Sequence, residues 1–118
     1  VVDDEATVRT IAARLLESLG FTVAIAEDGR AGVAVFERDP AAFDLVLMDL
    51  TMPHHDGVQA FGLMRRIRQD VRVILMSGFD EQDALTSFTG KGLAGFLQKP
   101  FDLTALTAKV RAALEAKA

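Results

Sequence analysis

The stretch VLMDLTMPHHDG, residues 46–57, is the most informative segment of the sequence. It begins inside an apolar run, Leu45 to Met48, that ends abruptly on a carboxylate, Asp49. Burying a lone carboxylate is costly, so this group needs a partner or a route to solvent. Asp56-Gly57 then marks a turn before a segment with helical spacing. The stretch therefore predicts a buried strand, a polar loop and a helix.

The same alternation extends in both directions along the chain. Longer segments with helical spacing separate short β-prone apolar runs at Val1-Val2, Thr22 to Ala26, Leu45 to Met48, Val71 to Met76 and Gly95 to Gln98. Five strands alternating with five helices predict an α/β fold with a parallel sheet that helices cover on both faces. Periodicity alone leaves the strand order open.

The composition indicates one globular domain spanning residues 1–118. Half of the 118 residues are hydrophobic, a quarter are charged, and the net charge is −4. The acidic balance argues against direct nucleic-acid binding. The chain has no cysteine, and no apolar run has the roughly 20 residues needed to span a bilayer. We therefore expect a cytoplasmic domain without a membrane segment, and a chain trimmed within its first strand, because Val1-Val2 resembles a strand end.

Polar side chains follow four of the five predicted strands. Open parallel sheets bind ligands beyond the carboxyl ends of their strands, so these groups are expected to meet at one edge. They are Asp3 and Asp4 after the first strand, Asp49 after the third, Ser77 after the fourth and Lys99 after the fifth.

This set of groups suits phosphoryl chemistry. Clustered carboxylates raise one another's pKa unless a cation intervenes, and Mg²⁺ prefers such hard oxygen ligands. A lysine and a hydroxyl are suitable donors to a phosphoryl group. A carboxylate can itself attack phosphorus and form an acyl phosphate. The sequence therefore predicts a phosphoryl acceptor with Asp49 as the attacking group.

The motifs resemble those of the receiver domain of two-component response regulators. The matching residues are Asp3-Asp4, Asp49 with Met52-Pro53 and Asp56-Gly57 behind it, Ser77-Gly78, and Lys99-Pro100-Phe101. They occur in the family's order and spacing along essentially the whole chain. The resemblance implies a flavodoxin-like (CheY-like) three-layer fold with strand order 2-1-3-4-5.

The resemblance also implies a role for each residue. Asp49 would accept a phosphoryl group from a histidine kinase or histidine phosphotransfer protein. Asp4, Asp49 and the backbone carbonyl of Thr51 would ligate Mg²⁺, with Asp3 acting through water. Lys99 would pair with Asp49 and then with the phosphate.

Further implied roles concern the switch. Ser77 and Phe96 would move together after phosphorylation and alter the face formed by the fourth and fifth helices and the strand between them, a possible homodimer surface. Phe96 occupies a position where the family often has tyrosine. In the alternative interpretation, Ser77 is only a helix N-cap and Phe96 is only a core residue. Thr51 and Phe79, which would flank the attacking water, are neither strong acids nor strong bases. We therefore expect slow autodephosphorylation and no other enzymatic activity.

Several alternatives stay open from the sequence. The segment GKGLAGFLQKPF, residues 90–101, resembles receivers at the C-terminus of hybrid sensor histidine kinases, which would pass phosphate onward. A Mg²⁺-dependent aspartyl phosphatase would need a second acid two residues after the nucleophile, where Thr51 lies. A flavin- or nucleotide-binding module would need a phosphate-binding loop in place of Asp3-Asp4-Glu5. His54-His55 is read as a solvated loop and not as a metal site.

Overall fold

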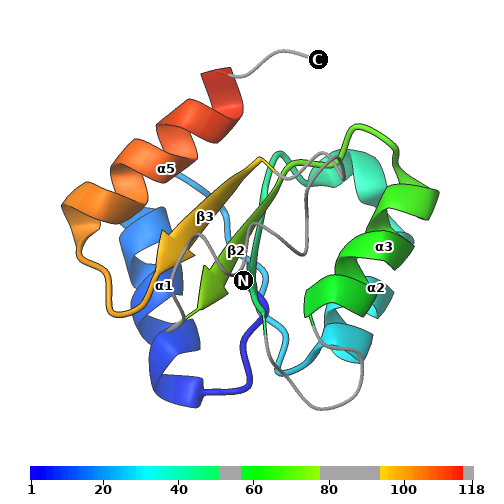
Figure 1. Ribbon diagram of the computed structural model, residues 1–118, viewed down its shortest axis with the longest axis horizontal. Coiled ribbons are helices and arrows are strands. Elements are labelled where there is room, and N and C mark those ends of the chain that lie inside the picture. The colour runs from blue at the N-terminus through cyan, green and yellow to red at the C-terminus, as the bar shows by residue number, and fades with distance from the viewer. Residues whose placement is uncertain (51–56, 78–93, 116–118) are drawn as a thin grey trace.

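The computed structural model describes residues 1–50, 57–77 and 94–115 (Figure 1). Along the chain these residues form α1 (Ala6–Ser18), α2 (Gly29–Arg38), a short 3₁₀ helix η1 (Pro40–Ala42), β1 (Val46–Asp49), α3 (Gly57–Ile67), β2 (Val73–Ser77), β3 (Gly95–Gln98) and α5 (Leu103–Glu115). The helix predicted between β2 and β3 lies outside the described residues.

Within the described residues the sheet is parallel and has three strands in the order β1-β2-β3. Asp49 is aligned with Met76, and Ser77 with Gln98, so the strands end close to one another. Val2 forms parallel bridges with both Ala26 and Met48, which places the Val1-Val2 segment between Ala26 and β1.

The predicted five-stranded sheet is only partly represented in this arrangement. The segments at Val1-Val2 and Thr22 to Ala26 contribute single bridges and not strands, because only Val2 and Ala26 make ladder contacts. The order 2-1-3-4-5 and the number of five helices therefore stay predictions.

Strand side chains alternate between two hydrophobic clusters on opposite faces of the sheet. One cluster packs Val46, Met48, Val73, Leu75 and Phe96 against α2 and α3, with Phe36, Ala60, Phe61 and Met64 from the helices. The other packs Leu47, Ile74, Met76 and Leu97 against α1 and α5, with Ala12, Leu16, Leu106, Val110 and Ala113. Figure 1 shows these helix pairs on the two sides of the sheet. This two-sided burial explains why the strands are continuously apolar in sequence.

Local signals set the ends of three helices. Gly20 follows α1 with φ 98°, a left-handed conformation that favours glycine, and its N–H donates to the carbonyl of Glu17. Asp28 caps α2 by accepting a hydrogen bond from the N–H of Ala31 at 2.8 Å. Asp102 caps α5 through its Oδ1 in the same way. These caps fix where the helices begin and end relative to the strands.

Arg68, just after α3, fastens the segment that leads into β1. Its Nη1 donates to the carbonyls of Pro40 at 3.1 Å and Phe43 at 2.7 Å, and its Nε pairs with Asp70 at 2.9 Å.

Among the helices that can be described, none combines the length and apolar character required to cross a membrane.

Candidate functional site

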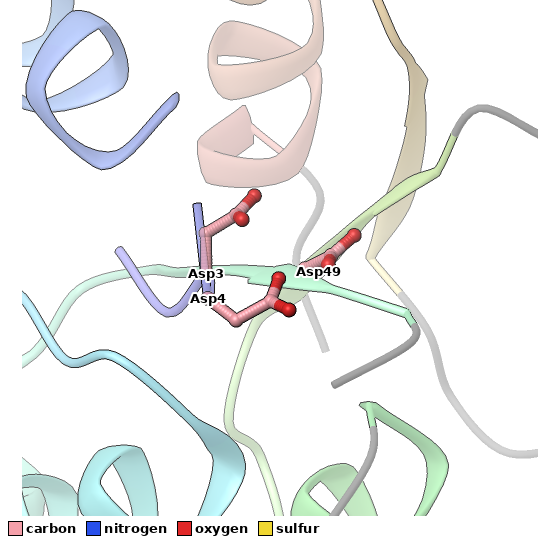
Figure 2. A group of neighbouring side chains, drawn as sticks. All are labelled: Asp3, Asp4 and Asp49. Carbon is pink, nitrogen blue, oxygen red and sulfur yellow. The ribbon is translucent and has the colours of Figure 1, made fainter. Parts of the chain in front are cut away.

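Three carboxylates gather where the strands end (Figure 2). Asp49 is the last residue of β1, and its N–H donates to the carbonyl of Val2 at 2.8 Å. Asp3 and Asp4 follow Val2 directly, so this backbone pairing brings both segments to one edge. One carboxylate oxygen from each of Asp3, Asp4 and Asp49 lies within 4.8 Å of the others. The predicted convergence of these acids is therefore present in the structure.

Asp3 is the most deeply buried of the three acids, with 0% exposure. Its N–H donates to the carbonyl of Ala26 at 3.1 Å, and its Oδ1 accepts from the N–H of Glu5 at 2.9 Å. Its carbonyl accepts from Nη1 of Arg9 at 2.7 Å. Its buried Oδ2 lies 2.8 Å from Nζ of Lys99 and forms an ion pair with it. Charge compensation makes this burial possible.

Lys99 supplies the positive charge of the site. Lys99 is the first residue after β3, and its backbone N–H donates to the carbonyl of Ser77 at 2.7 Å. Its Nζ lies 2.8 Å from Asp3, 3.2 Å from Asp49 and 3.7 Å from Glu5. The peptide bond between Lys99 and Pro100 is cis. One ammonium therefore serves three carboxylates from two other chain segments.

The electrostatics of the site raise the pKa of Asp49 when no metal is bound. Burial raises the pKa of Asp49 from 3.8 to about 6, the negative charge of Asp3 adds to the rise, and Lys99 opposes it. Burial tends to lower the pKa of Lys99, but its contacts with Asp3 and Asp49 outweigh burial and raise that pKa above its ordinary value. An added cation beside these acids would hold Asp49 in its charged form.

The donor set fits a hard divalent cation such as Mg²⁺. All three acids offer oxygen ligands within a short distance of one another. Asp4 is exposed, whereas Asp49 is only 7% exposed, so solvent reaches the cluster from the side of Asp4. Mg²⁺ usually retains several waters and takes one or two carboxylates, which matches a cluster that is partly open.

Comparison with known proteins identifies the family. The sequence profile of the response regulator receiver domain matches residues 1–111, which is nearly the whole chain. This chain belongs to the response regulator receiver domain family. The resemblance drawn from the motifs at the strand ends is thereby confirmed.

Relatives of this receiver domain occur in proteins of different organisation. The chain is 33% identical over 115 residues to the sensor kinase CckA of Brucella abortus, with 98% of this chain and 12% of the kinase covered. It is 36% identical over 121 aligned positions to the transcriptional regulatory protein SphR of Synechococcus elongatus, with 97% of this chain and 47% of that protein covered. The chain thus spans less than half the length of either curated relative.

Solved structures confirm a CheY-like flavodoxin fold for the receiver domain. The receiver domain of the hybrid histidine kinase CckA superposes with a TM-score of 0.81 at 32% identity and covers 97% of this chain and 95% of its own. The Borrelia burgdorferi CheX–CheY–BeF₃–Mg²⁺ complex contains a chain that superposes with a TM-score of 0.91 at 25% identity, covering 98% and 87% of the two chains.

The other predicted site residues of the receiver domain have the following positions. Ser77 ends β2, is 3% exposed and is bonded through its carbonyl to Lys99. Phe96 is 2% exposed and packs in the cluster beneath α2 and α3. Thr51 lies outside the described residues, as do the other residues of 51–56 and 78–93. The structure therefore brings Asp3, Asp4, Asp49 and Lys99 into direct contact or close grouping, with Ser77 on the adjacent strand end.

Two features of the site were not predicted from the sequence. Arg9 contacts the carbonyl of Asp3 from α1, although its spacing looks like that of any polar helical residue. Gly57 begins α3 so close to the end of β1 that an added Cβ would lie 2.6 Å from the carbonyl oxygen of Asp49. The turn dipeptide Asp56-Gly57 was a signal for the glycine, but it gave no indication of this close approach.

Proposed function

We propose that this receiver domain accepts a phosphoryl group on a carboxylate oxygen of Asp49, with Mg²⁺ bound beside it. The observation that supports the proposal most strongly is the position of Asp49 at the strand end, 3.2 Å from Lys99 and grouped with Asp3 and Asp4. A carboxylate in this setting has a positive neighbour for incoming phosphate oxygens and a place for a metal ion.

Asp49 acts as the nucleophile in the proposed transfer. Its carboxylate oxygen forms a bond to phosphorus while the bond from phosphorus to the nitrogen of a phosphohistidine breaks. The imidazole leaves with the electron pair of that bond and takes up a proton from solvent, and the product is an aspartyl phosphate. The step needs ionised Asp49, whose pKa of about 6 permits the charged form at neutral pH.

The remaining residues position charge around that step. By the family resemblance, Asp4, Asp49 and the carbonyl of Thr51, which lies outside the described residues, would hold Mg²⁺, and Asp3 would act through water; a bound Mg²⁺ would neutralise phosphate oxygens. Lys99 lies between Asp3 and Asp49 and shifts its pairing from carboxylate to phosphate oxygen as charge moves onto the transferred group. The chemistry is therefore mostly positioning and neutralisation.

The proposed response to phosphorylation passes through Ser77 and Phe96. Ser77 lies on the strand adjacent to β1, and Phe96 lies on the next strand, where it is aligned with Leu75. We propose that they couple the phosphate to the face containing β3 and α5, which then contacts a homodimer partner or an output domain. The donor partner would be a histidine kinase or a histidine phosphotransfer protein. Turnover of an external substrate is not proposed, apart from slow loss of the domain's own phosphate.

Intact-mass spectrometry tests the proposal directly. The domain is incubated with acetyl phosphate or phosphoramidate and Mg²⁺, and we expect one added phosphoryl group. Asp49→Asn should remain unmodified, whereas Asp44→Asn, the same chemical change at an exposed position before β1, should be modified like the parent. Equal modification of Asp49→Asn and the parent would rule out Asp49 as the acceptor.

A relay role is a second candidate, supported by the similarity to the CckA receiver at 32% identity. In that case the aspartyl phosphate would be passed to a histidine phosphotransfer protein. Loss of the added mass on mixing the phosphorylated domain with such a protein, accompanied by gain of the same mass on the partner, would distinguish a relay from a terminal acceptor.

A further inference from the structure

We propose that Arg9 is a positioning residue for the acidic pair Asp3-Asp4, acting through the peptide bond that joins these two residues. This inference rests on the proposed Mg²⁺ site. Nη1 of Arg9 donates to the carbonyl oxygen of Asp3 at 2.7 Å. A charged donor at this distance makes a stronger hydrogen bond than a neutral one. Arg9 therefore ties α1 to the backbone that carries the acids.

The start of α1 depends on this contact because the usual side-chain cap is missing. The N-cap residue, Glu5, makes no capping hydrogen bond with its side chain. The turn is held by Oδ1 of Asp3, which accepts from the N–H of Glu5, and by the guanidinium of Arg9 on the Asp3 carbonyl. Both contacts end on Asp3, so the turn and the acidic pair are stabilised together.

Asp4 is the acid whose orientation depends most on the backbone. It is exposed, and among the described residues its side chain makes no hydrogen bond or ion pair. Asp3, by contrast, is fixed by Lys99 and by the N–H of Glu5. The backbone from which the Asp4 side chain projects is therefore held by the peptide unit that Arg9 contacts.

Arg9 has two effects on a bound cation, and they have opposite signs. As a nearby positive charge it repels Mg²⁺, so its removal would tighten binding. As a clamp on the Asp3-Asp4 peptide it organises the ligands, so its removal would weaken binding. Because partners outside the ligand set typically contribute 10- to 100-fold to metal affinity, we infer that the clamp outweighs the charge.

Titration with Mg²⁺ alone, followed by calorimetry, tests this inference. We expect Arg9→Ala to weaken Mg²⁺ binding about 10-fold. Arg9→Lys and Arg9→Gln keep an N–H donor, with and without the charge, and both should recover part of the loss. Arg14→Ala is the matched control, because it removes the same charge from an exposed position on α1 and should bind Mg²⁺ like the parent.

A second readout separates positioning from general stability. With saturating Mg²⁺ the phosphorylation rate of Arg9→Ala should approach that of the parent, while the Mg²⁺ concentration at half the maximal rate should rise about 10-fold. If Arg9→Ala does not fold, Arg9→Lys and Arg9→Gln decide the matter, with faster hydrogen exchange at the Glu5 amide as the expected sign of a loosened turn.

The outcomes distinguish this inference from the proposed function. A parent that binds Mg²⁺, with Arg9 variants that bind it equally or more tightly, overturns the role of Arg9 and leaves the metal site intact. An equal loss in Arg14→Ala also overturns it, since the effect would then not depend on the contact between Arg9 and the carbonyl of Asp3. A parent that does not bind Mg²⁺ overturns both the role of Arg9 and the metal site.

Discussion

Replacing Asp49 by asparagine is predicted to stabilise the metal-free domain. A pKa raised from 3.8 to about 6 means that ionised Asp49 lowers the free energy of unfolding by at most about 3 kcal/mol at neutral pH. Solvent at the open side of the cluster screens the charge, so about 1–2 kcal/mol is expected. Asparagine is nearly the same size and carries no charge, so it avoids this cost.

The dependence on pH has a definite sign. Between pH 3.8 and about 6 the folded state holds the proton of Asp49 more tightly than the unfolded chain does. The parent therefore loses stability as the pH rises through this window and does not regain it above. The advantage of Asp49→Asn should be small at pH 4 and reach its full size above pH 6.5.

Thermal unfolding in the presence of EDTA measures this effect. For a domain of this size about 1–2 kcal/mol corresponds to a rise in Tm of roughly 3–12 °C at pH 7.5. Asp44→Asn, an exposed change of the same kind, should leave the Tm unchanged. Added Mg²⁺ should stabilise the parent more than Asp49→Asn and so reduce the difference. A variant less stable than the parent at pH 7.5, or a difference independent of pH, would refute the reasoning.

Three further perturbations have predicted outcomes. Lys99→Ala leaves the buried carboxylate of Asp3 without its ion pair and should destabilise the domain by about 3–5 kcal/mol in urea unfolding. Because the pKa of Lys99 is raised, the parent should keep this stabilisation up to the ordinary titration range of lysine and lose it only at higher pH. A loss of this stabilisation below that range would contradict the ion pair. Gly57→Ala places a methyl group against the backbone of Asp49, so it should lower the free energy of unfolding by about 1–3 kcal/mol and slow phosphorylation from acetyl phosphate. An unchanged Tm and an unchanged rate would show that this position tolerates a side chain. Arg68→Ala loses hydrogen bonds to two backbone carbonyls before β1, so it should lower the free energy of unfolding by about 1–3 kcal/mol in thermal unfolding and leave the Mg²⁺ affinity unchanged. A changed Mg²⁺ affinity would show that these hydrogen bonds also influence the metal site.

Much of the site could be predicted because its residues lie at the ends of apolar runs. A parallel sheet brings the carboxyl ends of its strands together. The positions of Asp49 at the end of β1 and of Lys99 after β3 were therefore sufficient to predict that the two side chains lie close together. The strand positions were also accessible, since residues such as Leu75 and Met76 contact helices on opposite faces and make the run continuously apolar. The bounds of β3 agree with the prediction, whereas β1 and β2 begin and end later in the chain than the predicted apolar runs.

Other features depend on distances that periodicity does not contain. The segment ending at Ala26 is apolar like the strands, yet it contributes only one bridge, because ladder pairing depends on the neighbouring backbone and not on composition. Arg9 has the spacing of an ordinary helical residue, and only the direction of its side chain reveals the bond to Asp3. The complete burial of Asp3, deeper than that of Asp49, likewise follows from three-dimensional packing.

The position of Lys99 among three carboxylates has a consequence for how the domain exists between signals. An ammonium fixed by the polypeptide is a resident counterion that dialysis and chelators leave in place. Unlike a small zinc module that unfolds when its metal is removed, this domain should keep its shape in a cell depleted of magnesium. Scarcity of the ion would then silence the switch reversibly, without exposing the protein to degradation.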